Sequence, residues 1–182
     1  MKKFYSVHHS SQLTFMVCNS IIQISIIFFG LQKGFKLMIC SMFGHHDAPD
    51  SIIHSLNDLI HQLVKEQHIE KFLVGNQGKF DAMAYQVLSE SVIPKFPQID
   101  CQVILAYLPS VRPLAPIYKN AKTIYPEGLE KVPPRFAISH RNRWMVDQSD
   151  IVLVYCRCST GGTASIAEYA KKKGKILYNL SL

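Results

Sequence analysis

A helix, a buried strand, a glycine turn and a second helix are predicted, in that order, by RNRWMVDQSDIVLVYCRCSTGGTASIAEYAKKKGK, residues 141–175. The run Ile151–Tyr155 is continuously apolar and rich in β-branched residues, as expected of a parallel strand covered on both faces. Glycines let the backbone approach a ligand closely, hydroxyl groups can bond a phosphate, and a helix N-terminus carries partial positive charge. We therefore predict a site for a phosphate-bearing ligand at the turn between this strand and the second helix, which reads Ser159-Thr160-Gly161-Gly162-Thr163.

Length and composition predict one globular domain in a reducing compartment. The chain has 182 residues, of which 48% are hydrophobic, and can bury one sizeable core. Its five cysteines are odd in number and irregularly spaced, unlike a disulfide framework. Of the +7 net charge, four lysines lie in the first 37 residues, which leaves 16 basic against 13 acidic residues in the remainder. A balance of +3 is ordinary for a globular domain and argues against a nucleic-acid-binding surface.

The first 37 residues are expected to lie apart from this domain. Residues 13–31 read LTFMVCNSIIQISIIFFGL, close to the length that spans a bilayer, so a membrane anchor is one interpretation. A cleaved signal peptide is a weaker one, because no alanine precedes Ala48 to form the usual cleavage site. We favour a third, in which residues 1–37 are a disordered or mis-started extension and translation begins at Met38. Residues 38–182 would then form a cytoplasmic domain, with membrane attachment only if the apolar segment is a real anchor.

Strand and helix patterns alternate from Met38 onward. Helical spacing of apolar residues predicts helices over 52–64, 80–91 and 139–148, and a further helix after Gly162. A proline-rich excursion separates the third strand from the helix at 139–148. This order predicts an α/β, Rossmann-like doubly wound fold with a mostly parallel sheet and helices on both faces. The predicted strands are 38–44, 71–74, 101–108, 123–125, 151–155 and 175–179.

Three loops follow predicted strands and are candidates for one ligand site, because ligands bind beyond the carboxyl ends of parallel strands. One loop is the turn at 159–163, and another contains Gly44 and His45. The loop at 75–81 also suits a tight turn without a ligand. Neither the dinucleotide fingerprint G-x-G-x-x-G nor the phosphate loop G-x-x-x-x-G-K-[ST] occurs, which argues against both standard nucleotide sites. The candidates from this loop are Gly75, Gly78, Phe80 and Asp81.

Metal and cofactor signals are weak, and we predict neither group. His45 and His46 beside Asp47 lack a third and fourth ligand at a recognisable spacing. Cys156 and Cys158 form C-x-C rather than C-x-x-C, with no second pair in the chain.

Two charged side chains near the glycine turn have both a functional and an ordinary interpretation. Arg141 can clamp a phosphate, as bidentate arginines do, or can form a surface pair with Arg143. Glu168 can act as a catalytic acid or base, or can be a plain surface residue in the second turn of its helix.

From Met38 onward the sequence resembles the SLOG superfamily, specifically its YpsA-like branch. This Rossmann-like group is related to the Lonely Guy phosphoribohydrolases and to the DNA-processing protein Smf. The resemblance covers nearly all of residues 38–182 and none of 1–37. It rests on Gly44-His45 after the first strand, Gly75-x-x-Gly78-x-Phe80-Asp81, Arg141-Asn142-x-x-Met145, Ser149-Asp150 and Gly161-Gly162-Thr163.

The resemblance implies nucleotide binding more strongly than catalysis. In the Lonely Guy enzymes an arginine of R-K-x-x-M and a glutamate of P-G-G-x-G-T-x-x-E serve N-glycosidic cleavage of nucleoside monophosphates. Arg141 matches the first motif, with Asn142 in place of lysine, whereas the second lacks its proline and third glycine, and Glu168 is displaced to five residues beyond Thr163.

We therefore expect a domain that binds or senses a small nucleotide-like ligand. The phosphate would lie at residues 159–163, with Gly44, His45, Asn142 and the loop at 75–81 around it. One alternative is a hydrolase with Arg141 and either Glu168 or Asp81 as catalytic residues. The other is single-stranded DNA binding. Whether the chain forms a homo-oligomer is left open.

Overall fold

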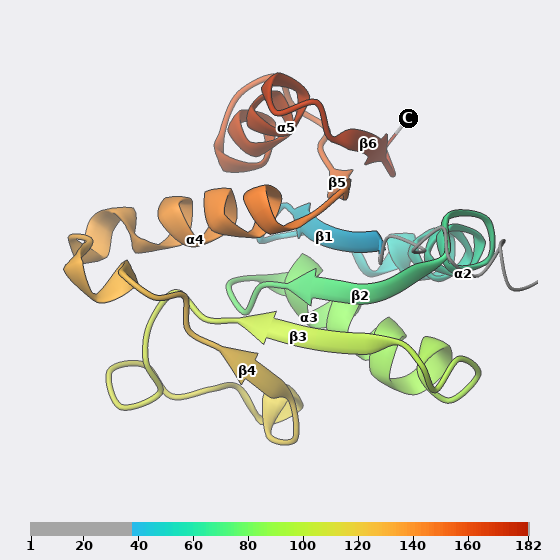
Figure 1. Ribbon diagram of the computed structural model, residues 1–182, viewed down its shortest axis with the longest axis horizontal. Helices are drawn as coiled ribbons and strands as arrows, with labels where there is room; N and C mark the ends of the chain where they lie inside the picture. Colours follow the sequence, from blue (N-terminus) through green and yellow to red (C-terminus); the bar gives the residue numbers. More distant parts are fainter. Residues whose placement is uncertain (1–37, 182) are drawn as a thin grey trace, which may run out of the picture. The chain divides into compact units, whose positions relative to one another are not determined.

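The computed structural model describes residues 38–181. The expectations for residues 1–37 lie outside the described residues and stay predictions. The domain boundary at Met38 lies at the edge of that range and also stays a prediction. Within that range, one sheet holds all the strands, in the order β4-β3-β2-β1-β5-β6, and every neighbouring pair is parallel (Figure 1). The strands are β1 (Met38–Gly44), β2 (Ile69–Val74), β3 (Asp100–Ile104), β4 (Lys122–Ile124), β5 (Ile151–Tyr155) and β6 (Ile176–Asn179).

Helices cover both faces of this sheet. The α-helices of the described range are α2 (Ile53–Gln67), α3 (Lys79–Val87), α4 (Pro134–Gln148) and α5 (Gly162–Lys172). A π-helical turn, Leu88–Val92, extends α3, and short 3₁₀ turns lie at Asp50–Ile52, Pro116–Tyr118 and Leu129–Lys131. No helix between residues 38 and 181 is long and apolar enough to cross a membrane.

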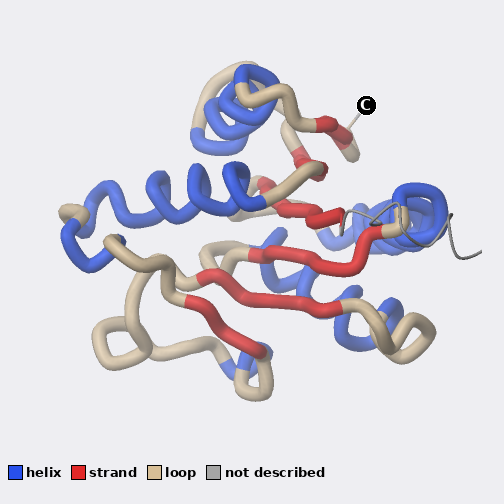
Figure 2. The backbone as a smooth tube through the Cα atoms, in the orientation of Figure 1, coloured by secondary structure: helices blue, strands red, loops and turns tan. Residues whose placement is uncertain are grey.

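Alternation along the buried strands divides the core into two layers. Met42 and Leu153 belong to the layer that α2 and α3 cover. Their chain neighbours Phe43, Val152 and Val154 belong to the layer that α4 and α5 cover. Successive strand residues point to opposite faces, so a continuously apolar strand supplies both layers. The predicted Rossmann-like, doubly wound fold is confirmed, and its helices and strands can be followed in Figure 2.

The chain changes direction across the sheet between β1 and β5. From β1 it proceeds outward through β2, β3 and β4, and it then returns through α4 to the other side of β1 to form β5 and β6. The chain leaves β1 toward α2 on one face and leaves β5 toward α5 on the other. A crevice at such a switch point is the usual ligand site of open α/β sheets.

Two element boundaries differ most from the sequence prediction. The third strand was expected to continue to Leu108 but ends at Ile104, and the chain then leaves the sheet after Leu105 donates its N–H to the Ile124 carbonyl oxygen at 2.8 Å. Helix α4 was expected to begin at Ser139 but begins at Pro134. Proline is tolerated in a first helical turn, where its missing N–H costs nothing, so a proline-rich stretch does not exclude a helix start.

Candidate functional site

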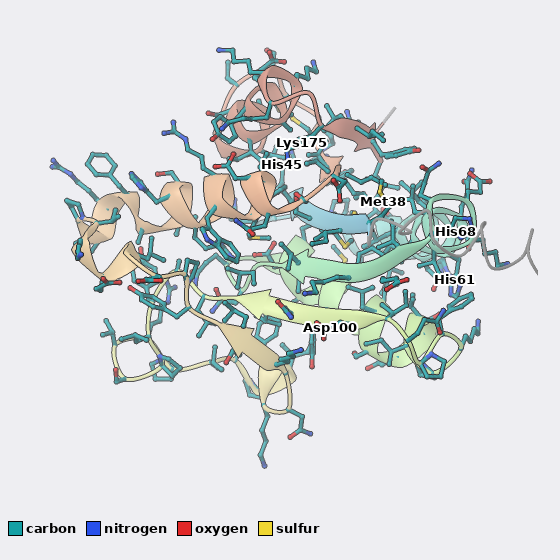
Figure 3. All side chains as sticks on the ribbon, viewed as in Figure 1. Met38, His45, His61, His68, Asp100 and Lys175 are labelled. Atoms are coloured by element: carbon teal, nitrogen blue, oxygen red, sulfur yellow. The ribbon has the colours of Figure 1, made fainter. Side chains whose placement is uncertain are left out.

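A cavity of about 220 Å³ lies at the β1–β5 switch point. Four segments that are far apart in the sequence form its walls: the loop after β1, the loop after β2 with the start of α3, the middle of α4, and the start of α5. Figure 3 shows Met38 at the start of β1 and His45 beyond the end of that strand. The lining residues are Phe43, Gly44, His45, His46, Gln77, Asp81, Ile138, Arg141, Asn142, Gly162, Thr163 and Ile166.

Arg141 enters the cavity from α4 and is almost fully buried. Its side chain is 2% exposed, and its Nη1 donates a hydrogen bond of 2.8 Å to the carbonyl oxygen of Ile104 at the end of β3. The interpretation as a surface pair is therefore wrong for Arg141. Arg143 is exposed, and its guanidinium lies 5.6 Å from the centre of the Tyr169 ring.

Asp81 is the carboxylate of this cavity, and it lies with Arg141 against Gly75. A Cβ atom at Gly75 would collide with Asp81 Oδ2 and with Arg141 Nη1, so glycine is required there for space. Asp81 Oδ2 accepts the backbone N–H of Gln77 at 2.8 Å. Burial raises the pKa of Asp81, and the nearby Arg141 guanidinium and the Gln77 N–H oppose that shift. For Arg141, burial lowers the pKa of the guanidinium, and the negative charge of Asp81 opposes that shift.

Gly44, Gly78 and Phe80 lie in the segments that surround the cavity. A Cβ atom at Gly44 would collide with the Phe80 ring, which is 1% exposed and stacks on Tyr155 with ring centres 6.3 Å apart. Gly78 has a φ of 137°, and a Cβ there would lie 2.8 Å from the Cα of His46. Of these three predicted site residues, the structure places only Gly44 at the cavity surface.

His45 joins the loops on the two sides of the switch point. Its Nε2 accepts the backbone N–H of Arg157 at 3.1 Å, and its ring meets the Tyr155 ring edge-on at 5.9 Å. His45 therefore links the loop after β1 to the loop after β5, at the point where the pairing of the two strands ends.

The start of α5 supplies free backbone donors to the same cavity. Gly161, the residue before the helix, has a φ of 100°, and no side chain caps the first turn, which also contains no acidic residue. A Cβ atom at Gly161 or Gly162 would meet no atom within 4 Å. The first N–H groups of a helix have no intrahelical partner and attract anions. Gly162 and Thr163 line the cavity, whereas the predicted Ser159, Thr160 and Gly161 do not.

Glu168 is separated from Arg141. It lines a second cavity of about 450 Å³, together with Cys156, Cys158 and Ser159. Its Oε1 accepts from Lys171 Nζ at 2.9 Å, and this contact lowers the pKa of the exposed Glu168 carboxyl. The structure therefore places the two predicted catalytic residues in different cavities.

Several lining residues were not among the sequence candidates. Gln77 lies inside a loop that was singled out, so its position in that loop was a usable signal. Ile138 and Ile166 have only the apolar character of ordinary core residues, which no sequence signal separates from packing. Between residues 38 and 181, no group of three or more His, Cys, Asp or Glu side chains is arranged to hold a metal ion.

Comparison with known proteins finds similarity in structure but none in sequence: no protein-family model and no curated protein matches the chain. DNA processing protein A from Helicobacter pylori, studied for its single-stranded DNA binding mode, aligns with a TM-score of 0.56 at 17% identity. That alignment covers 78% of this chain and 64% of the other, so this chain spans less than two thirds of that neighbour.

A second solved structure is the molybdenum cofactor binding protein from the phototrophic bacterium Rippkaea orientalis. It aligns with a TM-score of 0.53 at 19% identity, over 80% of this chain and 77% of the other. At these identities the likeness shows the fold alone. Both alignments agree with the Rossmann-like fold that the resemblance implies.

Proposed function

We propose that this chain binds a nucleotide or nucleotide-derived ligand through its phosphate, in the cavity at the β1–β5 switch point. The observation that supports this most directly is that Arg141 and the uncapped start of α5 line one cavity. A guanidinium and free helix N–H groups both recognise anions, and the buried position of Arg141 strengthens its interaction with one. Thr163 and Asn142 add neutral hydrogen-bonding groups to the same wall.

The size of the cavity indicates which part of the ligand it encloses. At about 220 Å³ it is smaller than the roughly 300 Å³ at which pockets for whole drug-sized ligands begin. The phosphate and its adjoining sugar would occupy it, with the remainder of the ligand outside. The two structural neighbours are described as binding single-stranded DNA and a molybdenum cofactor, which supports ligand binding by a fold of this type.

Titration calorimetry with AMP, NAD, ADP-ribose, cyclic nucleotides and inorganic phosphate tests the proposal. Thr163→Ala should weaken binding by about tenfold, the value of one hydrogen bond to a charged group. Ser165→Ala is the matched control, because it removes a hydroxyl from an exposed position in the same helix that does not line the cavity. If no compound in the panel binds, or if both variants bind as the unmodified chain does, the proposal is wrong.

Hydrolysis of the N-glycosidic bond of a nucleoside 5′-monophosphate is a second candidate, with Asp81 rather than Glu168 as the acid or base. Asp81 lines the cavity with Arg141, and burial raises the pKa of its carboxyl, as suits a group that must hold a proton. Release of free base, followed by chromatography, should be lost in Asp81→Asn and retained in Glu168→Gln. If turnover is absent, or survives both changes, this candidate is excluded.

Single-stranded DNA binding is tested in the same experiments. An oligothymidylate added at two salt concentrations should bind weakly if the site takes a small ligand. Strong binding that falls steeply as salt rises would instead favour DNA as the ligand, because each neutralised phosphate releases a counterion.

A further inference from the structure

Two buried polar atoms beside the cavity have no hydrogen-bond partner among residues 38–181. They are Tyr118 Oη and Arg141 Nε, in side chains that are 3% and 2% exposed. Buried polar groups are nearly always hydrogen-bonded in native proteins, so each exception requires an explanation. Arg141 lines the cavity, whereas Tyr118 is not among its lining residues.

Tyr118 reaches this position from the proline-rich excursion between β3 and α4. It closes the short turn Pro116–Tyr118, and its ring centre lies 5.2 Å from that of Tyr85. Tyr85 follows Asp81 by four residues on α3, so both lie on the same helix face. In Figure 1 the arrowheads of β2 and β3 point toward the excursion, at the carboxyl edge of the sheet.

The Tyr118 hydroxyl interacts electrostatically with both charged groups of the site. Burial is the largest cause of the raised pKa of Tyr118, the charge of Asp81 raises it further, and that of Arg141 lowers it. Tyr118, Asp81 and Arg141 therefore form one buried cluster, although they come from the excursion, α3 and α4.

We propose that Tyr118 is a positioning residue of the ligand site, whose hydroxyl donates to the Asp81 carboxylate when the Arg141 guanidinium turns toward a bound anion. This inference rests on the proposed function. In the structure, Asp81 Oδ2 accepts from the Gln77 N–H and lies with Arg141 against Gly75. An anion in the cavity competes with Asp81 for the guanidinium, and a buried carboxylate that loses its cation is costly.

The free hydroxyl of Tyr118 offsets that loss. Because Tyr118 Oη has no hydrogen-bond partner among residues 38–181, it can donate to Asp81 without breaking another hydrogen bond. A hydrogen bond to a carboxylate is about twice as strong as one between neutral groups. The excursion thus becomes part of the site, in keeping with the functional role that long loops in compact domains usually have.

The test compares Tyr118→Phe with Tyr85→Phe in the full chain, the second change removing a hydroxyl from the adjacent ring. Tyr118→Phe should unfold thermally at the same temperature as the unmodified chain or higher, because it deletes an unpartnered buried polar atom. It should nevertheless bind AMP and inorganic phosphate roughly tenfold more weakly. Tyr85→Phe should bind as the unmodified chain does.

A double-mutant cycle tests whether Tyr118 acts through Asp81. In an Asp81→Asn background, Tyr118→Phe should weaken binding much less than it does alone, because the carboxylate that accepts from it is gone. Unchanged affinity of Tyr118→Phe, or an equal loss in both backgrounds, would overturn the inference and leave the proposed function standing. If the unmodified chain binds neither probe, the proposed function fails, and this inference fails with it.

Discussion

Gly75 is required by two charged side chains rather than by backbone conformation. Asp81 and Arg141 both lie where its Cβ would be, and all three residues are buried. Neither charged group can withdraw into solvent without leaving the other uncompensated. The glycine thus allows a carboxylate and a guanidinium to meet at the end of β2.

Gly75→Ala should lower the free energy of unfolding by about 1–3 kcal/mol, the usual cost of overpacking a buried site. The measurement is urea unfolding followed by circular dichroism. Gly162→Ala is the matched control, because a Cβ there meets no atom within 4 Å. That variant should stay within about 1 kcal/mol of the unmodified chain, since alanine is the better helix former. Equal losses in the two variants would contradict the collision at Gly75.

Asp81 should make stability depend on pH in an unusual direction for a carboxylate. Burial raises its pKa in the folded state above the unfolded value of 3.8. Its contribution is therefore fully present below about pH 3.8 and is lost as pH rises through the folded pKa. Compared with Asp81→Asn, the unmodified chain should lose stability as pH rises above about 4, measured by urea unfolding at each pH. A difference that moves the other way would mean that the attraction of Arg141 outweighs burial.

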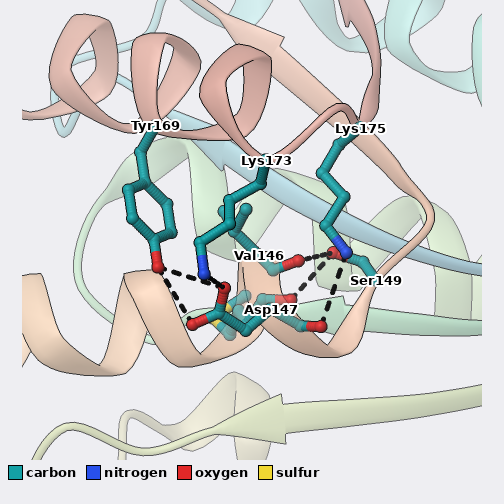
Figure 4. A network of polar contacts seen from close by, with 7 residues as sticks. Val146, Asp147, Ser149, Tyr169, Lys173 and Lys175 are labelled. Carbon is teal, nitrogen blue, oxygen red and sulfur yellow. Dashed lines mark hydrogen bonds and ion pairs between the residues drawn. The ribbon is translucent and has the colours of Figure 1, made fainter.

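At the scale of elements, α4 and α5, which both line the cavity, are also linked by polar contacts around Asp147. Asp147 of α4 accepts from the Tyr169 hydroxyl of α5 at 3.0 and 3.1 Å, and Lys173 Nζ lies 3.0 Å from its Oδ1 (Figure 4). Lys175 Nζ donates to the Asp147 carbonyl oxygen at 3.5 Å. Because α4 carries Arg141 and α5 begins at Gly162, this network sets the distance between the anion-binding groups.

Tyr169→Phe should lower the free energy of unfolding by about 0.5–1.5 kcal/mol, the net value of one hydrogen bond. It should also weaken phosphate binding slightly, because α4 and α5 are held less firmly. Thermal unfolding and calorimetry measure the two effects. Tyr178→Phe, on β6 and outside this network, is the control. A Tyr169→Phe protein that matches this control in both measurements would show that the network does not stabilise the pair of helices.

At the scale of the whole molecule, the order of the strands creates the site. The loops after β1 and β5 leave toward opposite faces of the sheet, and the cavity lies between them. Arg141 reaches from α4 to the Ile104 carbonyl oxygen at the end of β3, and His45 links the loop after β1 to the loop after β5. The site thus depends on the entire sheet and not on any one loop.

A protein that begins at Met38 should fold and bind as the full chain does, because residues 38–181 form one sheet with a buried core on each face. We expect a single cooperative thermal transition and an unchanged affinity for phosphate. Circular dichroism and calorimetry provide both measurements, with the full chain as control. Aggregation of the shorter protein, or loss of its cooperative transition, would show that residues 1–37 contribute to the folded domain.

Much of the fold was predictable from local pattern. The apolar run Ile151–Tyr155, the glycine turn after it and the alternation of strands and helices from Met38 onward indicate a doubly wound sheet, because hydrophobic periodicity reports which faces are buried. The same reasoning placed Gly44, His45 and Gly162 near one edge of the sheet, where they line the cavity.

Only the tertiary structure decided which charged side chains lie together in the cavity. Arg141 and Glu168 were paired from their sequence motifs, yet the first lines the cavity with Asp81 and the second lies in another cavity. Tyr118 came from a proline-rich stretch that carried no signal of a site. Local pattern indicates which apolar residues are buried, but the direction of α4 and the path of the excursion determine which polar atoms are buried together.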